Sequence, residues 1–324
     1  MNETTPSRDA RATITRWVMT VLMAGVAASG CKEAPNKKFM VHSSKTVDID
    51  LSGTSGPLQI RLESGNIVVT SDPNVESMQM EVIYNCRGSD REAVKSRTSS
   101  MEIEVEQTGG GLKLTEGNTA GKGFEDSVDV TIRFPVSKAF DLQIKVDTGD
   151  IRIQGISGTM KLQGIDGNMK VENSTGEMTL FTRTGNLSVL DSRGTLTANT
   201  HDGNMTIREH SGEGIRATCV AGNIDIELAR DGLGPLIVDT TTGRIYLTVG
   251  SEFDGTLNLG ARRGKILVED PGARILESNV ENKGERSLVI GDDGPISSLG
   301  TSSGSIAVRI LPPNPTPGLD KSPS

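Results

Sequence analysis

The chain of 324 residues has few aromatic residues, 3 % of the sequence, and only 34 % of its residues are hydrophobic. That share is low for a thick globular core, but it suffices for a thin interior lined by single Ile, Leu, Val and Met side chains. Trp17 is the only tryptophan, and Tyr84 and Tyr246 are the only tyrosines. Flat aromatic surfaces on which sugars stack are therefore scarce.

Basic clusters with interleaved aromatic residues are also missing, which argues against a nucleic-acid partner. The formal net charge is −8, and the acidic residues are spread along the chain, as expected for solubility rather than for attracting a charged substrate. No helix is expected after Ser211–Gly214 to bind a phosphate. We expect no enzyme activity and no cofactor.

No apolar run is long enough for a confident membrane span; the one near the N-terminus, Trp17–Ala27, is too short. It follows three arginines and ends at Ala28-Ser29-Gly30-Cys31, which predicts a signal peptide over residues 1–30. Small residues before a cysteine resemble the lipobox of bacterial lipoproteins. The resemblance implies that Cys31 carries fatty acyl chains such as palmitate and anchors the chain in a membrane. Lys32 after the cysteine then favours the outer membrane of a cell that has one. Ordinary secretion and a retained anchor are the alternatives.

Loss of the signal peptide leaves Cys31, Cys86 and Cys219, of which the last two are free to pair. An oxidising compartment permits a disulfide. Each of these two continues an inward-facing strand alternation, which favours two separate buried thiols. His42, His201 and His210 are predicted to be solvated turn residues, since they offer too few ligands for zinc.

A polar tether is expected over residues 31–38, followed by a β region over residues 39–147 that continues into the repeat array or caps it. Strands with one buried face are predicted where apolar residues alternate, as in Val128–Ile132. Ser64–Val69 already contains a phrase of the repeat described next. A short helix is predicted near residues 92–98, and a glycine-rich loop over residues 109–123.

From Gly149 to Gly212 a glycine recurs at every ninth position and opens the phrase Gly-x-Φ-x-Φ, where Φ is apolar. Nine residues suit one strand and a tight turn, so two units make an 18-residue coil. Every second glycine is followed by Asp or Asn, in the pairs Gly149-Asp150, Gly167-Asn168, Gly185-Asn186, Gly203-Asn204 and Gly222-Asn223. Coils about 4.8 Å apart place these side chains above one another, where they can hydrogen-bond along the stack, and the glycine supplies a positive φ.

The sequence therefore predicts an all-β fold, a right-handed parallel β-solenoid over residues 148–311 with coils of about 18–21 residues. Beyond Gly212 the phrases begin at Gly222, Gly243, Gly264, Gly284 and Gly304. This spacing predicts longer coils with longer turns on one side, and an open last coil whose edge is covered by a disordered tail, residues 312–324.

A calcium-binding β-roll is disfavoured, because this chain has one glycine in each unit, and Asp166 and Asp202 fall two coils apart. The adjacent acids Asp292 and Asp293 are predicted to form a turn. Neither pattern indicates a metal site.

The segment Val130–Pro135 followed by Leu142–Ile151 is similar to a bacterial family of putative adhesins, envelope proteins built as β-solenoids. The resemblance spans residues 39–310, implies the fold and carries no catalytic motif. We expect a non-enzymatic, envelope-anchored adhesive, binding or scaffolding module, with a membrane and an unknown cell-surface protein or glycan as partners. The alternative is a carbohydrate-active or carbohydrate-binding β-helix, marked by a groove with two close carboxylates and a basic residue. The sequence does not indicate an oligomeric state.

Overall fold

The computed structural model describes residues 14–20, 39–49, 51, 56–108, 110–117, 123, 125–136, 139–230, 232, 234–292 and 294–312. The chain divides into two compact units, Met1–Gly167 and Asn168–Ser324. Cys31, the predicted tether and the predicted tail beyond Pro312 lie outside the described residues, as does the predicted signal peptide apart from residues 14–20. Within the described part of the chain, no helix is long and apolar enough to cross a membrane.

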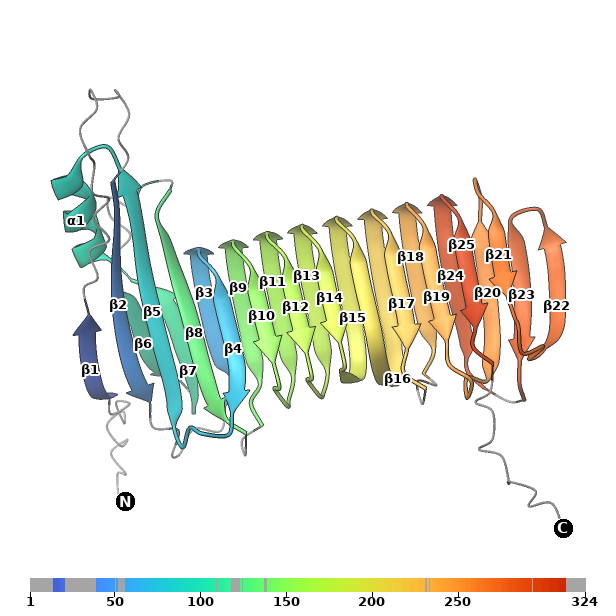
Figure 1. Ribbon diagram of the computed structural model, residues 1–324, viewed down its shortest axis with the longest axis horizontal. Helices are drawn as coiled ribbons and strands as arrows, with labels where there is room; N and C mark the ends of the chain where they lie inside the picture. Colours follow the sequence, from blue (N-terminus) through green and yellow to red (C-terminus); the bar gives the residue numbers. More distant parts are fainter. Residues whose placement is uncertain are drawn as a thin grey trace, which may run out of the picture. The chain divides into compact units, whose positions relative to one another are not determined.

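Within its described residues, the first unit contains eleven strands and one helix, whose arrangement Figure 1 shows. Its elements are β1 (Ile14–Thr20), β2 (Phe39–Ile49), β3 (Leu58–Ser64), β4 (Ile67–Asp72), β5 (Met78–Gly88), α1 (Arg91–Ser100), β6 (Ile103–Thr108), β7 (Gly111–Glu116), β8 (Ser127–Pro135), β9 (Leu142–Thr148), β10 (Ile151–Gln154) and β11 (Met160–Asp166). Sheet A of this unit has the order β1–β2–β5–β8–β4–β10, and sheet B has the order β6–β7–β3–β9–β11. The parallel pairing of β4 with β10 confirms that the phrase at Ser64–Val69 belongs to the stack.

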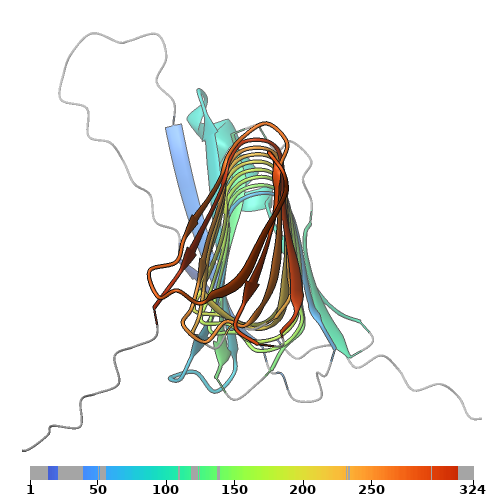
Figure 2. The ribbon, with the colours of Figure 1, turned by 90° about the vertical axis from the view of Figure 1, so that its right-hand side faces the viewer.

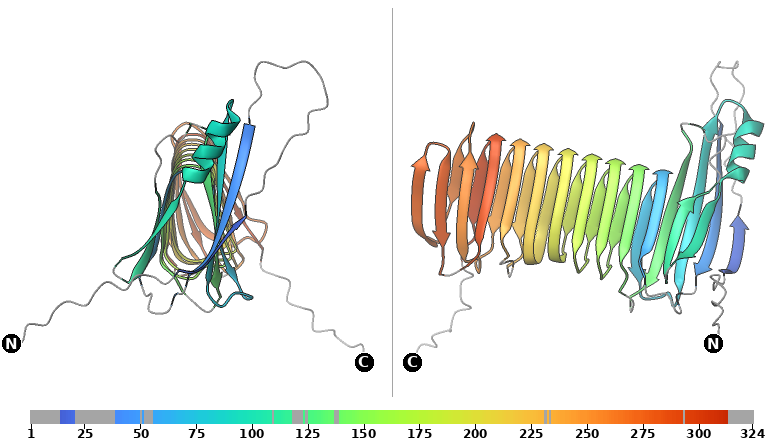
Figure 3. Two further views of the ribbon diagram at one scale, coloured as in Figure 1. Left: turned by 90° about the vertical axis from the view of Figure 1, so that its left-hand side faces the viewer. Right: turned by 180° about the vertical axis from the view of Figure 1, so that it is seen from behind.

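Helix α1 confirms the predicted short helix. The Asp90 side chain caps it by accepting hydrogen bonds from the backbone N–H groups of Glu92 and Ala93, at 2.9 and 3.1 Å. Buried Val94 and Thr98 face β2 and β5, against which the helix lies (Figure 3). The predicted glycine-rich loop over residues 109–123 is wrong in part, because Gly111–Glu116 forms strand β7 and pairs with β6 as a hairpin. Gly110, with φ of 85°, supplies the turn.

The second unit consists of strands only, within its described residues. They are β12 (Met169–Glu172), β13 (Met178–Thr184), β14 (Leu187–Leu190), β15 (Arg193–Asp202), β16 (Met205–Ala221), β17 (Ile224–Leu228), β18 (Leu236–Thr242), β19 (Ile245–Val249), β20 (Gly255–Ala261), β21 (Ile266–Glu269), β22 (Ile275–Asn282), β23 (Glu285–Ile290), β24 (Ile296–Ser303) and β25 (Ile306–Ile310). Sheet A of this unit has the order β12–β14–β16–β17–β19–β25–β21 and is parallel throughout. Sheet B has the order β13–β15–β16–β18–β24–β20–β23–β22, with its last two pairings antiparallel. Viewed along the stack, the coils lie behind one another as nested arches (Figure 2).

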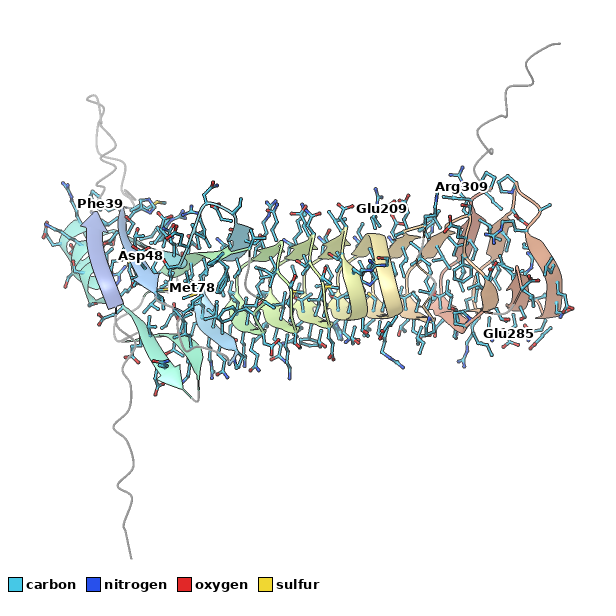
Figure 4. All side chains as sticks on the ribbon, turned by 90° about the horizontal axis from the view of Figure 1, so that it is seen from below. Phe39, Asp48, Met78, Glu209, Glu285 and Arg309 are labelled. Carbon is cyan, nitrogen blue, oxygen red and sulfur yellow. The ribbon has the colours of Figure 1, made fainter. Side chains whose placement is uncertain are left out.

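The interior of the second unit consists of columns of apolar side chains that stack from coil to coil. One column of sheet A runs through residues that are paired in register and at most 2 % exposed: Met169, Leu187, Met205, Ile224, Ile245 and Ile306. Alternate residues point outward on both sheets (Figure 4). The all-β, solenoid-like architecture with many parallel strands is therefore confirmed.

At the C-terminal end the coils do not stack in chain order, and the predicted coil at Gly284 and the predicted open edge of the last coil are wrong. β25 lies between β19 and β21, and β24 lies between β18 and β20, so the coil that is last in sequence is inserted between two earlier ones. Gly284 opens no coil; it lies in the tip of the antiparallel β22–β23 hairpin. The unpaired edges at this end belong to β21 and β22, among the described strands, and not to the last coil. Because every coil begins with the same phrase, the spacing of the glycines along the chain does not show which coils are neighbours in the stack.

Candidate functional site

The predicted turn glycines are required by their geometry. Gly149, Gly167, Gly185, Gly203 and Gly222 have φ between 140° and 155°. In the second unit, a Cβ on Gly203 would lie 2.1 Å from the carbonyl oxygen of Gly185, and one on Gly222 would lie 2.0 Å from that of Gly203. These glycines therefore hold the coils at their spacing.

The Asp and Asn residues after these glycines form the predicted ladder, mainly from side chain to backbone. The Oδ1 atoms of Asn168, Asn186 and Asn204 accept hydrogen bonds from the backbone N–H groups of Asn186, Asn204 and Asn223, at 3.0, 2.9 and 2.9 Å. In the first unit, the Asp150 N–H donates to the Asn66 side chain at 3.0 Å in the same way. This ladder is exposed and links the turns of successive coils.

On the inner face of sheet B, side chains stacked from coil to coil form hydrogen bonds with the backbone carbonyl oxygens of the turn glycines. Thr240 and Thr301 donate through Oγ1 to the carbonyl oxygens of Gly222 and Gly243, both at 3.1 Å. Cys219 occupies the corresponding position one coil earlier, and its Sγ lies 3.4 Å from the Gly203 oxygen. Burial raises the pKa of the Cys219 thiol and that of the Cys86 thiol. Both are buried and free, which confirms two separate thiols.

The histidines differ from the prediction in two cases. His201 is exposed beside Asp202, as predicted. His42 is half-buried within β2, hydrogen-bonded to Asn85. His210 is 2 % exposed, and its Nε2 lies 3.0 Å from the carbonyl oxygen of Gly194. Burial lowers the pKa of His210, and among the described residues its Nδ1 has no hydrogen-bond partner. His210 lies within β16, where Glu209 has φ of 49° and the register shifts between Arg208 and His210, an irregularity that the local sequence does not signal.

Carboxylates do not gather into a metal site within the described ranges: no group of three or more His, Cys, Asp or Glu residues is placed to hold an ion. Asp150, Asp166 and Asp202 are exposed, and Asp292 lies in a turn, while Asp293 is outside the described residues.

A groove of about 910 Å³ crosses the outer face of sheet B in the second unit. Its floor is Gly300 on β24 beside Gly260 on β20, two residues paired in register. One wall is formed by β16 and β18, and the other by the tip of the β22–β23 hairpin. The tip is fixed to the floor because the Ala261 N–H donates to the Gly284 carbonyl oxygen at 2.7 Å. The polar side chains that line the groove are Thr218, Asp239, Thr241, Arg262, Asn282, Lys283, Glu285 and Ser302.

The two floor glycines differ from the turn glycines because their backbones do not require glycine. Neither has a positive φ in the left-handed region. A Cβ on Gly260 would meet no atom within 4 Å, and one on Gly300 would meet first the Asp239 carboxylate, at 2.5 Å. Glycine inside a strand costs about 0.5–1 kcal/mol relative to alanine and often marks the place where a ligand approaches the backbone. The groove is therefore the candidate binding site.

The charged groups of the groove are arranged for contact along a surface rather than for a paired acid–base reaction. Asp239 and Glu285 lie on β18 and β23, three strand spacings apart, which separates their backbones by about 14 Å. Glycosidases hold their two carboxyl groups about 5–10 Å apart. Figure 4 shows Glu285 on sheet B and Arg309 on sheet A, on opposite outer faces of the unit.

The groove was not predicted from the sequence, although a signal for it exists. Gly260 and Gly300 fall at outward positions inside strands, away from the glycines that open each phrase. Only the inserted coil places them side by side.

A family model described as Toastrack DUF4097 matches residues 58–309, and the chain belongs to this family. No curated protein matches the chain.

Several solved structures are similar at low identity. A putative adhesin from Parabacteroides merdae is 12 % identical, with a TM-score of 0.44, covering 83 % of this chain and 96 % of that one. A putative adhesin from Bacteroides fragilis is 12 % identical, with a TM-score of 0.40, covering 85 % and 97 %. A putative lipid binding protein from Parabacteroides distasonis is 14 % identical, with a TM-score of 0.35, covering 82 % and 96 %.

Proposed function

We propose that this member of the Toastrack DUF4097 family is an exported adhesive or scaffolding module that is anchored in the cell envelope through lipid on Cys31 and binds its partner in the sheet B groove. The observation that carries the proposal is the groove floor, where Gly260 lacks a side chain although neither packing nor backbone conformation requires this. A binding role without catalysis agrees with the spread of the carboxylates.

The binding test uses a matched pair of variants of the chain that begins at residue 31 and carries Cys31→Ser. Gly260→Leu places a bulky side chain on the groove floor, where its Cβ meets nothing. Thr197→Leu places the same side chain at an outward position of β15, outside the groove. Pull-down from envelope extracts should retain the partner with Thr197→Leu and lose it with Gly260→Leu. Equal retention by both variants would exclude the groove.

Anchoring is tested separately in cells. Replacing Cys31 with Ser removes the proposed acylation site and should move the protein from the membrane fraction to the soluble fraction. Unchanged membrane retention would refute lipidation.

A glycan is the second candidate ligand for the same groove. The observation in its favour is the set of planar polar side chains around a flat floor, Asp239, Asn282, Glu285 and Arg262, which can bond to neighbouring hydroxyl groups. A glycan array with the same two variants separates a glycan from a protein partner, because only a glycan ligand gives array signals that Gly260→Leu abolishes.

A further inference from the structure

The C-terminal end of the stack in the second unit has a step. Sheet A ends at β21, whereas sheet B continues past β20 with β23 and then β22. Among the described strands, β21 pairs only with β25 and β22 only with β23, so each has one edge of unpaired backbone N–H and C=O groups. Such edges recruit further strands unless something covers them.

The step is also apolar. Val280 faces the interior side of β22, because its partner Arg286 on β23 is two residues from fully buried Leu288, yet Val280 is 68 % exposed. Leu276 on β22 is 62 % exposed, and Leu267, at an outward position of β21, adds a further exposed apolar side chain, 56 % exposed. Ile266 and Val268 are half-buried, whereas the corresponding Ile306 and Val308 are at most 1 % exposed. The end therefore exposes side chains that the rest of the stack buries, and such clusters mark association surfaces.

We propose that the occupant of this step is a second copy of the same chain, joined end to end about a two-fold axis. The two-fold axis runs parallel to the strands, midway between the two sheets. It places sheet A of each copy end to end with sheet B of the other copy. The projecting β22–β23 hairpin of each copy then continues sheet A of the other, and β22 pairs with the partner's β21. Such a contact uses the same surface on both copies and closes on itself.

Strand direction and charge agree with this joint. β22 runs in the same direction as β20, because both are antiparallel to β23. β21, which follows β20 on the opposite sheet, runs in the opposite direction. A two-fold axis parallel to the strands preserves these directions, so the pairing of β22 with the partner's β21 is antiparallel. The outward side chains at the edge strand β21 are Lys265, just before it, and Leu267 and Glu269 within it. With Leu267 opposite Asn279 of the partner's β22, Lys265 lies opposite Glu281, and opposite charges on neighbouring strands stabilise a pairing. Glu269 then lies opposite Glu277, and its charge is balanced by Arg309 on β25, at 3.9 Å.

The chain's own C-terminal segment is a poor alternative occupant. It begins at Pro312 and contains further prolines at positions 313, 315, 317 and 323. Proline has no N–H to donate to an edge strand, so a sequence with this many prolines is poorly suited to pair with either edge.

Sedimentation velocity on the full mature chain with Cys31→Ser tests the dimer over a wide concentration range. We expect a reversible dimer, and Val280→Lys should weaken it by about tenfold or more by placing charge in the joint. The matched control, Phe181→Lys, changes an exposed apolar residue on β13 and should leave the dimer intact. Val280 is exposed in one copy, so its variant should keep its circular dichroism and melting temperature. A monomer at every concentration, or equal effects of both variants, would overturn the proposal.

Cysteine cross-linking tests the orientation. Leu267 on β21 and Asn279 on β22 both point outward, so the joint brings them together across the two copies. Mixing Leu267→Cys chains with Asn279→Cys chains should give mixed disulfide dimers, since antiparallel neighbours lie at disulfide distance. Cross-links formed only between identical variants would show a different interface and refute the joint, as would capture of an unrelated protein with no self-association.

Discussion

Replacing Gly203 by alanine should destabilise the second unit far more than the same substitution at Gly260. Gly203 has φ of 152°, and the new Cβ would lie 2.1 Å from the carbonyl oxygen of Gly185. The coils cannot separate without loss of the turn hydrogen bonds from the Gly203 N–H to Ala221 O, at 3.0 Å, and from the Asn204 N–H to Asn186 Oδ1, at 2.9 Å.

The expected size follows from these two effects. A non-glycine residue in this backbone region costs about 1–3 kcal/mol. Two weakened hydrogen bonds cost about 1 kcal/mol each, which brings the loss to about 3–5 kcal/mol. Total stabilities are about 5–15 kcal/mol, so Gly203→Ala should lower the denaturant midpoint strongly.

The matched variant Gly260→Ala removes a strand-interior glycine whose new Cβ meets nothing within 4 Å. It should leave stability unchanged or raise it by about 0.5–1 kcal/mol. Equilibrium unfolding in urea, followed by circular dichroism, measures both variants. Equal midpoints for the two would refute the distinction between turn glycines and floor glycines.

Three further predictions concern the interior. Leu187→Ala should cost about 2–5 kcal/mol in the free energy of unfolding, because the residue is 2 % exposed between Met169 and Met205; a loss below 1 kcal/mol would show that the column is not tightly packed. Thr240→Val removes the donor to the Gly222 oxygen and should cost about 1 kcal/mol, whereas a neutral result in chemical denaturation would argue against the hydroxyl column. Burial lowers the pKa of His210 in the fold, so its contribution to stability should be complete above about pH 6.5 and be lost as the pH falls through the lowered value. The His210→Gln variant should not show this loss of stability in acid. An equal loss of stability in acid for the variant and the parent protein would show that the ring does not cause it.

The regular coils were predictable because their cause is local. A glycine at the turn is needed for a positive φ, and an Asn after it can bond to the next coil, so Gly185-Asn186 and Gly203-Asn204 carry the information within a few residues. The separate burial of Cys86 and Cys219 followed from strand alternation in the same way.

The order of the terminal coils was not predictable, because it depends on contacts between distant segments that share one phrase. β24–β25 follows β20–β21 in the chain but stacks before it. The groove depends on that insertion, since it alone places Gly300 beside Gly260. The inward turn of His210 likewise depends on its contact with Gly194, a residue of the preceding coil.

The most direct test of groove binding is site-specific photo-crosslinking in intact cells. A photoreactive residue at Thr241, which is exposed and lines the groove, should form a specific cross-link to an envelope component. The same residue at Thr197, outside the groove on the same sheet, should not. A cross-link from Thr197 and none from Thr241 would contradict binding in the groove.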